Sequence, residues 1–217
     1  MIGALAIVLL GASAVAAARR RRRGRLPGRA VIVSPRRSTV IERDGAVSSV
    51  QTAELSMPAD RLAALWSPAN LENLGRTYWA FLSRVTLGLI RVVYGENERA
   101  VALLGRPLTL LRFEAPEYEL EGDHGSVRWQ IRDGLLVARS GKGCGFLALD
   151  VNRQEQDKVR IEVEVANFYP AIAAGFSMPV YRVTQAFIHV LVTHAFLRSL
   201  ATLELKESKV GVLSALR

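Results

Sequence analysis

The hydrophobic pattern of the chain changes twice, and these changes divide it into three parts. Residues 1–18 form an uncharged run, MIGALAIVLLGASAVAAA. Between residues 69 and 94, apolar residues recur mostly at steps of three and four, which predicts an amphipathic α-helix. From residue 108 to residue 168 the period falls to two, which predicts consecutive β-strands. The pattern therefore indicates an apolar N-terminal segment followed by an α+β domain.

The strand region alternates cleanly between apolar and polar positions. Val127, Trp129 and Ile131, for example, alternate with charged or amide side chains. One face of an antiparallel sheet is then covered and the other is exposed to water. The pair Asp133-Gly134 is typical of a hairpin turn. Strands are expected at residues 46–56, 108–113, 117–121, 126–132, 135–139, 146–151 and 159–168, with a short extended piece at 39–41.

Two more helices complete the predicted domain. A short helix is expected at residues 60–66, where Asp60 can cap the first turn. Residues 179–205 carry apolar side chains at helical spacing over a wide surface, which indicates a long helix buried on several sides. As a membrane span this segment is poor, because charges at Arg182 and Arg198 interrupt it. We expect it to cover the inner face of the sheet.

The N-terminal run is long enough to cross a bilayer, at roughly 27 Å for about eighteen helical residues. An arginine block follows it directly: Arg19, Arg20, Arg21, Arg22, Arg23 and Arg25. No basic residue precedes the run, and positive charge after it resists translocation. We therefore expect a single-pass anchor in the cell membrane, with the N-terminus outside and the domain in the cytoplasm. A cleaved signal peptide, an interfacial helix and a misread start are the alternatives.

The charge distribution changes what the basic composition means. Net charge is +9 and the pI is about 10.4, values that normally suggest nucleic acid as a partner. Nine of the 29 basic residues lie in the first 37 residues, which leaves 20 basic against 20 acidic residues in the remainder. The domain is therefore neutral. We expect the arginines to lie at an anionic membrane surface or simply to set topology, and we expect no nucleic acid partner.

These features divide the chain into a transmembrane anchor at 1–18, an arginine- and proline-rich linker at 19–45, a domain at 46–205 and a frayed tail at 206–217. The order of elements resembles the helix-grip, START-like superfamily, which includes polyketide cyclase-like and lipid-transfer-like proteins. The segments AELSMPADRLAALWSPANL at 53–71 and FYPAIAAGFSMPVYRVTQAFIHVLVTHAFLRSL at 168–200 carry the resemblance. It implies a curved antiparallel sheet of about seven strands around the long C-terminal helix, with an apolar cavity between them.

A polar and aromatic stripe on the last helix is the candidate ligand site. Tyr181, Gln185 and His189 follow one another at steps of four, and facing Tyr118 and Trp129 they could orient an apolar small molecule or lipid. Three alternatives stay open. In the first, these side chains are ordinary buried groups bonded within the core. In the second, the domain is a cyclase, hydratase or hydrolase in which His189 is the acid or base, and in the third it is a partner-docking protein without a cavity.

Other motifs point to no chemistry. The glycine-rich sequence at 139–146 lacks the spacing of a phosphate-binding loop and is expected to be a turn. Cys144 is the only cysteine, so the chain holds no intrachain disulfide. The spacing of five between His189 and His194 does not place both on one helical face, which argues against a metal pair. We expect no metal and no cofactor, and the sequence leaves the oligomeric state open.

Overall fold

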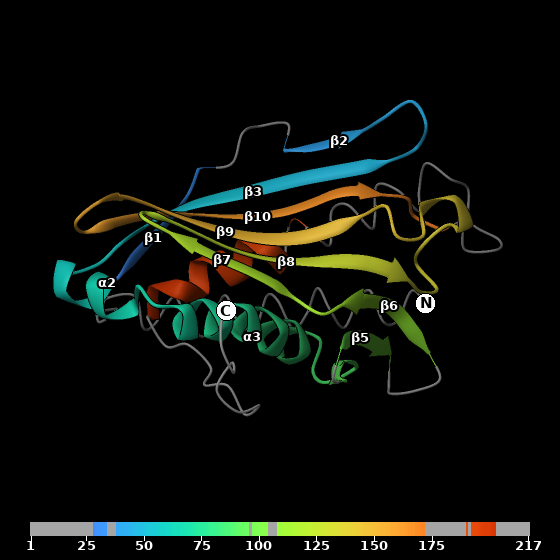
Figure 1. The fold of residues 1–217 in the computed structure, drawn as a ribbon, viewed down its shortest axis with the longest axis horizontal. Coiled ribbons are helices and arrows are strands. Elements are labelled where there is room, and N and C mark those ends of the chain that lie inside the picture. The colour runs from blue at the N-terminus through green and yellow to red at the C-terminus, as the bar shows by residue number, and fades with distance from the viewer. Residues whose placement is uncertain are drawn as a thin grey trace.

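The computed structural model describes residues 28–33, 38–95, 97–103, 108–171, 190 and 192–202. The predicted anchor at 1–18 and the arginine block therefore lie outside the described residues. Over the described part, the chain forms a large antiparallel sheet with helices packed on one face (Figure 1). Among these residues, no helix is long and apolar enough to cross a membrane.

Ten strands make up the sheet in the described part of the chain, in the order β1-β3-β10-β9-β8-β6-β5-β4, with β2 beside β3 and β7 beside β8. The prediction of about seven strands is therefore wrong, although the α+β class and the antiparallel sheet with a C-terminal helix are confirmed. The strands are β1 (Arg29–Ile32), β2 (Thr39–Ile41), β3 (Val47–Ser56), β4 (Ile90–Tyr94), β5 (Glu98–Leu103), β6 (Thr109–Glu114), β7 (Glu117–Glu121), β8 (His124–Asp133), β9 (Phe146–Glu155) and β10 (Lys158–Phe168).

The expected alternation of faces holds along the central strands. Val127, Trp129 and Ile131 on β8 are buried, as are Val159, Ile161 and Val163 on β10. The acidic residues of β7 face solvent. Because side chains alternate across a strand, every second position of these strands contributes to one continuous core.

Two helices precede the second half of the sheet. α2 (Ala59–Leu65) begins after Pro58, with Asp60 in its first turn, and the structure gives it no side-chain cap. The predicted cap at Asp60 is therefore wrong. α3 (Pro68–Val85) begins at Ser67, whose hydroxyl accepts a hydrogen bond from the backbone N–H of Asn70. That bond satisfies one of the free donors at the helix start.

The helix predicted at 69–94 is too long. α3 ends at Val85, where Leu87 and Gly88 adopt positive φ angles of 54° and 79°. The N–H of Gly88 donates to the carbonyl of Ser83 at 2.8 Å, the bond of a Schellman motif in which Leu87 follows the C-cap Thr86 in the left-handed conformation. The following residues then form β4, which pairs with β5, a strand absent from the sequence prediction.

The strand predicted at 135–139 and the hairpin predicted at Asp133-Gly134 are also wrong. β8 ends at Asp133, and the chain then bonds back to β6 through Leu135 and Leu136. Val137 forms an isolated bridge with Pro170, and a 3-10 helix, η2 (Arg139–Gly141), follows. The backbone bonds to β6 and the bridge to Pro170 take the place of the strand expected at residues 135–139.

The C-terminal helix is described at residues 192–199 and ends in a 3-10 turn, η3 (Leu200–Thr202). It packs beside α3, with the ring centroid of Phe196 lying 5.1 Å from that of Tyr78 and 5.9 Å from that of Phe81. Figure 1 shows this helix, in dark red, on the same side of the sheet as α3. The core lies between the two helices and the sheet.

Candidate ligand-binding cavities

A cavity of about 220 Å³ lies between the sheet, α3 and the C-terminal helix, and we call it the main cavity. It exceeds the roughly 150 Å³ of an apolar cavity that is known to hold benzene. Its described lining comes from strands on both halves of the sheet, from α3 and from Val192 of the last helix. Most of these side chains are apolar, among them Leu82, Val101, Phe113, Ile131, Leu147 and Val165.

Aromatic side chains form one wall of the main cavity. Trp79 lies at the centre of this wall, with ring centroids 5.1 Å from Tyr78, 5.3 Å from Phe113 and 5.3 Å from Trp129. Such tilted and edge-on contacts fix the rings in place. Burial raises the pKa of Tyr78 to about 12, so its phenol stays neutral at physiological pH. The wall is therefore rigid and uncharged.

A network of polar side chains lies at the β2 and β3 end of the main cavity. Gln51 is fully buried, and its amide nitrogen donates to Ser38 Oγ at 2.7 Å and to Ser49 Oγ at 3.1 Å. The hydroxyls of Ser49 and Thr39, which both line the cavity, lie 3.0 Å apart. The network is therefore continuous from the buried amide to the cavity surface.

His194, on the C-terminal helix, completes the network from the opposite side. Its Nε2 lies 2.6 Å from Oε1 of Gln51, and because Gln51 uses its nitrogen toward the serines, this oxygen accepts from the imidazole N–H. Burial, followed by the nearby Arg198 charge, lowers the pKa of His194 below 6.5. The imidazole is therefore neutral at pH 7, and it ties the last helix to the sheet.

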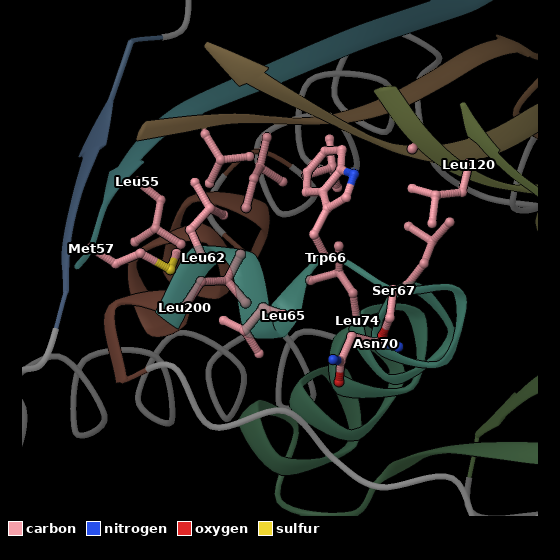
Figure 2. A pocket seen from close by; sticks show the side chains of 15 residues that line it. Leu55, Met57, Leu62, Leu65, Trp66, Ser67, Asn70, Leu74, Leu120 and Leu200 are labelled. Carbon is pink, nitrogen blue, oxygen red and sulfur yellow. Dashed lines mark hydrogen bonds between the residues drawn. The ribbon is translucent and has the colours of Figure 1, made fainter. Parts of the chain in front are cut away.

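A second cavity of about 80 Å³ lies under the corner between α2 and α3, and we call it the corner cavity. Figure 2 shows its apolar lining, with Leu55, Met57 and Leu62 on one side and Leu120 on the other. Trp66 stands over it from the end of α2, and its indole N–H donates to the carbonyl of Gly122 at 3.0 Å. The guanidinium of Arg153 lies 4.6 Å from the Trp66 ring centroid.

The structure places two of the five residues predicted to bind a ligand. Trp129 is buried, and its ring contacts that of Trp79. Tyr118 is half-buried on β7, and burial, together with the charge of Glu72, raises its pKa to about 12. Neither is among the side chains that line the main cavity or the corner cavity. Tyr181, Gln185 and His189 lie outside the described residues, so the ligand-binding role of all five stays a prediction.

The sequence analysis did not predict the polar network at the β2 and β3 end of the main cavity. The sequence of β3 nevertheless indicates the two members of this network that lie on that strand. Ser49 and Gln51 have the same strand parity as Ala53 and Leu55, whose side chains are buried. Two polar residues at inward positions of a strand indicate a buried polar group that needs partners. The partners are Thr39 on β2 and His194 on the last helix, and the apolar and polar pattern of β3 does not indicate either of them.

The described residues hold no group of three or more His, Cys, Asp or Glu side chains that could bind a metal ion. Cys144 is exposed. Its thiol lies 3.8 Å from the carbonyl oxygen of Ser140 and 3.7 Å from that of Lys142. Neither cavity is lined by a described Asp, Glu, Lys or Arg side chain. The chemistry that both cavities offer is apolar contact, with a small number of neutral polar groups.

No family model matches the chain, and no curated protein matches it either. Among solved structures, it is similar to a STAR-related lipid transfer protein from Xanthomonas axonopodis, with 15% identity over 76% of this chain and 97% of that one, and a TM-score of 0.33. Human StAR-related lipid transfer protein 5 shows 11% identity over 91% and 97% of the two chains, with a TM-score of 0.36. A protein from Mycobacterium smegmatis shows 10% identity over 76% and 94%, with a TM-score of 0.37.

StAR-related proteins are thus among the structures to which this chain is similar, as the START-like resemblance predicted. The identities are at most 15% and the TM-scores are below 0.5.

Proposed function

We propose that this domain binds an apolar small molecule or lipid in the main cavity. The observation that carries the proposal is the cavity itself, about 220 Å³ of space between the sheet and two helices with an apolar and aromatic lining. Ligand sites in proteins are concave, mostly apolar, and contain a few polar groups that orient the ligand. The Thr39 and Ser49 hydroxyls are polar groups of this kind.

The energetic reason for binding is the empty apolar surface. A void in a close-packed interior forfeits dispersion contacts along its lining, and an apolar ligand restores them. Burial of the ligand contributes about 25 cal/mol for each Å² of apolar area removed from water, before the cost of association is subtracted. The aromatic wall around Trp79 is held in place by its ring contacts, so little ordering is required when a ligand enters.

The direct test is native mass spectrometry of the purified full chain, followed by solvent extraction and analysis of whatever is released. We expect an additional mass on the folded protein, or uptake of an added naphthalene probe such as 2-isopropylnaphthalene with one molecule per chain. A Val165→Phe variant, in which the new ring enters the main cavity, is the matched control. Equal uptake of the probe by the two proteins would argue against the cavity as the site.

We also propose that residues 1–18 tether this module to a membrane, with the domain on the cytoplasmic side. The support is in the sequence, where the uncharged run is followed by six arginines within seven positions. Arginine and lysine residues next to an apolar span favour the cytoplasmic side of the membrane. Protease treatment of sealed inverted and right-side-out vesicles tests this. Digestion of the domain in right-side-out vesicles would overturn the proposed orientation.

A further inference from the structure

The hydroxyl groups of Thr39 and Ser49 hold one proton more than their described partners accept. Gln51 donates from its amide nitrogen to Ser49 Oγ, so this interaction uses a lone pair of the serine and leaves its proton free. Thr39 and Ser49 lie 3.0 Å apart and share one hydrogen bond, in which either hydroxyl can be the donor. Two hydroxyl protons are therefore available and only one of them is used.

The surplus proton is independent of the direction of the shared bond. If Ser49 donates to Thr39, the Thr39 proton lacks an acceptor, and if Thr39 donates, the Ser49 proton lacks one. Ser49 is only 3% exposed, Thr39 is half-buried, and both residues line the main cavity. Within the described part of the chain, no other hydrogen bond reaches either hydroxyl. A buried donor without an acceptor costs free energy, and this cost disappears when an acceptor arrives.

Trp79 carries a second donor without a described partner in the lining of the same cavity. Its side chain lines the main cavity and is 3% exposed, and its indole N–H is buried with no hydrogen bond partner among the described residues. An indole nitrogen only donates, so it too requires an acceptor. The hydroxyl pair and the indole of the lining therefore both require a hydrogen-bond acceptor.

We infer that the main cavity selects an apolar ligand that carries a neutral oxygen acceptor, such as a ketone or ester carbonyl, and that the Thr39–Ser49 hydroxyl pair and the Trp79 indole are its recognition groups. This inference rests on the proposed function and names its ligand class. No Asp, Glu, Lys or Arg side chain is among the described lining, so an ionised ligand finds no opposite charge. A protonated amine, which only donates, meets donors rather than acceptors.

A pair of probes of nearly equal shape separates carbonyl recognition from simple apolar binding. 2-Acetylnaphthalene presents a carbonyl oxygen, whereas 2-isopropylnaphthalene has a methyl group in its place. The affinity of each probe for the purified full chain is measured by fluorescence titration. Four variants of the proposed recognition groups, Thr39→Val, Ser49→Ala, the double variant and Trp79→Phe, are compared with the native chain and with a control variant, Ser199→Ala.

The double variant should bind the ketone about 3–10-fold more weakly, the usual effect of one lost hydrogen bond, and the hydrocarbon with unchanged affinity. Each single hydroxyl variant keeps one free proton and should lose less than about twofold, so the two losses are strongly non-additive. Trp79→Phe should reduce ketone affinity alone. Ser199→Ala, which removes a buried hydroxyl outside the cavity lining, should change neither affinity.

The outcomes separate this inference from the proposed function. Hydrocarbon binding that persists in every variant shows that the variants are folded and the cavity binds apolar molecules. If the ketone-to-hydrocarbon affinity ratio then stays constant in the double variant and in Trp79→Phe, the donors are satisfied by water and the inference is overturned while the proposed function stands. If the native chain binds neither probe, both are overturned.

Discussion

Gly75 of α3 lies directly against the indole ring of Trp129. A Cβ atom at position 75 would be 2.9 Å from Cζ2 and 3.0 Å from Cη2 of that ring. Trp129 is only 2% exposed and also contacts Trp79 edge-on, so its ring has no room to withdraw. The missing side chain therefore allows α3 to approach the sheet closely, which places Trp79 and Tyr78 in the wall of the main cavity.

Gly75→Ala should destabilise the domain, even though alanine is the better helix former. Alanine gains about 1 kcal/mol of helix propensity over glycine. Overpacking of a filled core typically costs about 1–3 kcal/mol, and here the new methyl group meets a ring that is itself packed. We expect a net loss of about 1–2 kcal/mol in the free energy of unfolding, measured by urea denaturation. Ser83→Ala on the same helix should be neutral or stabilising, and equal behaviour of both variants would contradict the packing account.

The strand pattern could be predicted from the sequence wherever one face of a strand is charged. β7 has the predicted bounds because Glu117, Glu119 and Glu121 alternate with Tyr118 and Leu120. In such a strand the alternation of charged and apolar residues identifies both the period of two and the face that is buried. The same reasoning correctly assigned the buried faces of β8 and β10.

The predicted helix at 69–94 failed because apolar spacing alone does not separate a helix end from a short strand. Val85, Leu89 and Val92 continue the step of three or four, yet the chain turns at Leu87 and Gly88. Four or five residues are too few to distinguish a period of 3.6 from a period of two. The glycine at position 88 was the signal in the sequence for the end of the helix, and the structure gives it a positive φ angle.

Gly134 shows that a turn signal can serve another purpose. The Asp133-Gly134 pair predicted a two-residue hairpin, but a Cβ atom at Gly134 would collide with the backbone carbonyl of Leu110. The glycine permits a close approach of two backbones, and the next residues bond β6. Likewise, the contact of His194 with Gln51 joins positions 143 residues apart. Local patterns contain no information about such a pairing.

Trp66→Phe should loosen the corner between α2 and α3. The substitution keeps a ring beneath Arg153 but removes the indole N–H that donates to the carbonyl of Gly122. This bond is exposed, so we expect a loss of about 0.5–1 kcal/mol. Faster hydrogen exchange at the amides of α2 would report the local opening.

Arg153→Met is the comparison for Trp66→Phe, because it removes the guanidinium and leaves the indole hydrogen bond intact. The ion pair of Arg153 with Asp123 is long, at 3.8 Å, and Asp123 is exposed. Exposed pairs of this kind contribute little. Hydrogen exchange at the amides of α2 should therefore increase less in Arg153→Met than in Trp66→Phe. A larger increase in Arg153→Met would show that the arginine, and not the indole hydrogen bond, holds this corner closed.

Acidification should weaken the attachment of the C-terminal helix through His194. The pKa of His194 is lowered in the folded chain, by burial and then by Arg198, so the unfolded chain binds the proton more readily. Stability is therefore fully present above the unfolded pKa of about 6.5, and it is lost as pH falls through the folded pKa. The melting temperature between pH 7.5 and 5.0 measures this effect.

The His194→Gln variant isolates that contribution, since its amide can still donate to Gln51 but does not titrate. Asp150 and Glu164 have pKa values raised first by burial, so they act in the opposite direction at lower pH and are common to both proteins. The native chain should lose melting temperature more steeply than the variant between pH 7 and 5.5. Parallel curves would show that His194 is not the source.

Val165→Phe should fill space that the main cavity leaves empty. Val165 lines this cavity and pairs with Ser49 across the strands, so a phenyl ring there occupies the polar end. We expect stability within about 1 kcal/mol of the native chain, because the ring enters a void rather than a packed region, and at least tenfold weaker binding of 2-isopropylnaphthalene.

The same substitution two residues earlier provides the contrast. Val163 lies on the same face of β10, is fully buried and does not line either cavity. A phenyl ring at this position has no free volume, so Val163→Phe should lose about 1–3 kcal/mol of unfolding free energy. Val165 is partly buried and lies beside the cavity, whereas Val163 is enclosed by packed side chains, so the two variants should differ. Equal losses at both positions would mean that the space next to Val165 is already filled, and the proposed ligand site would have to be abandoned.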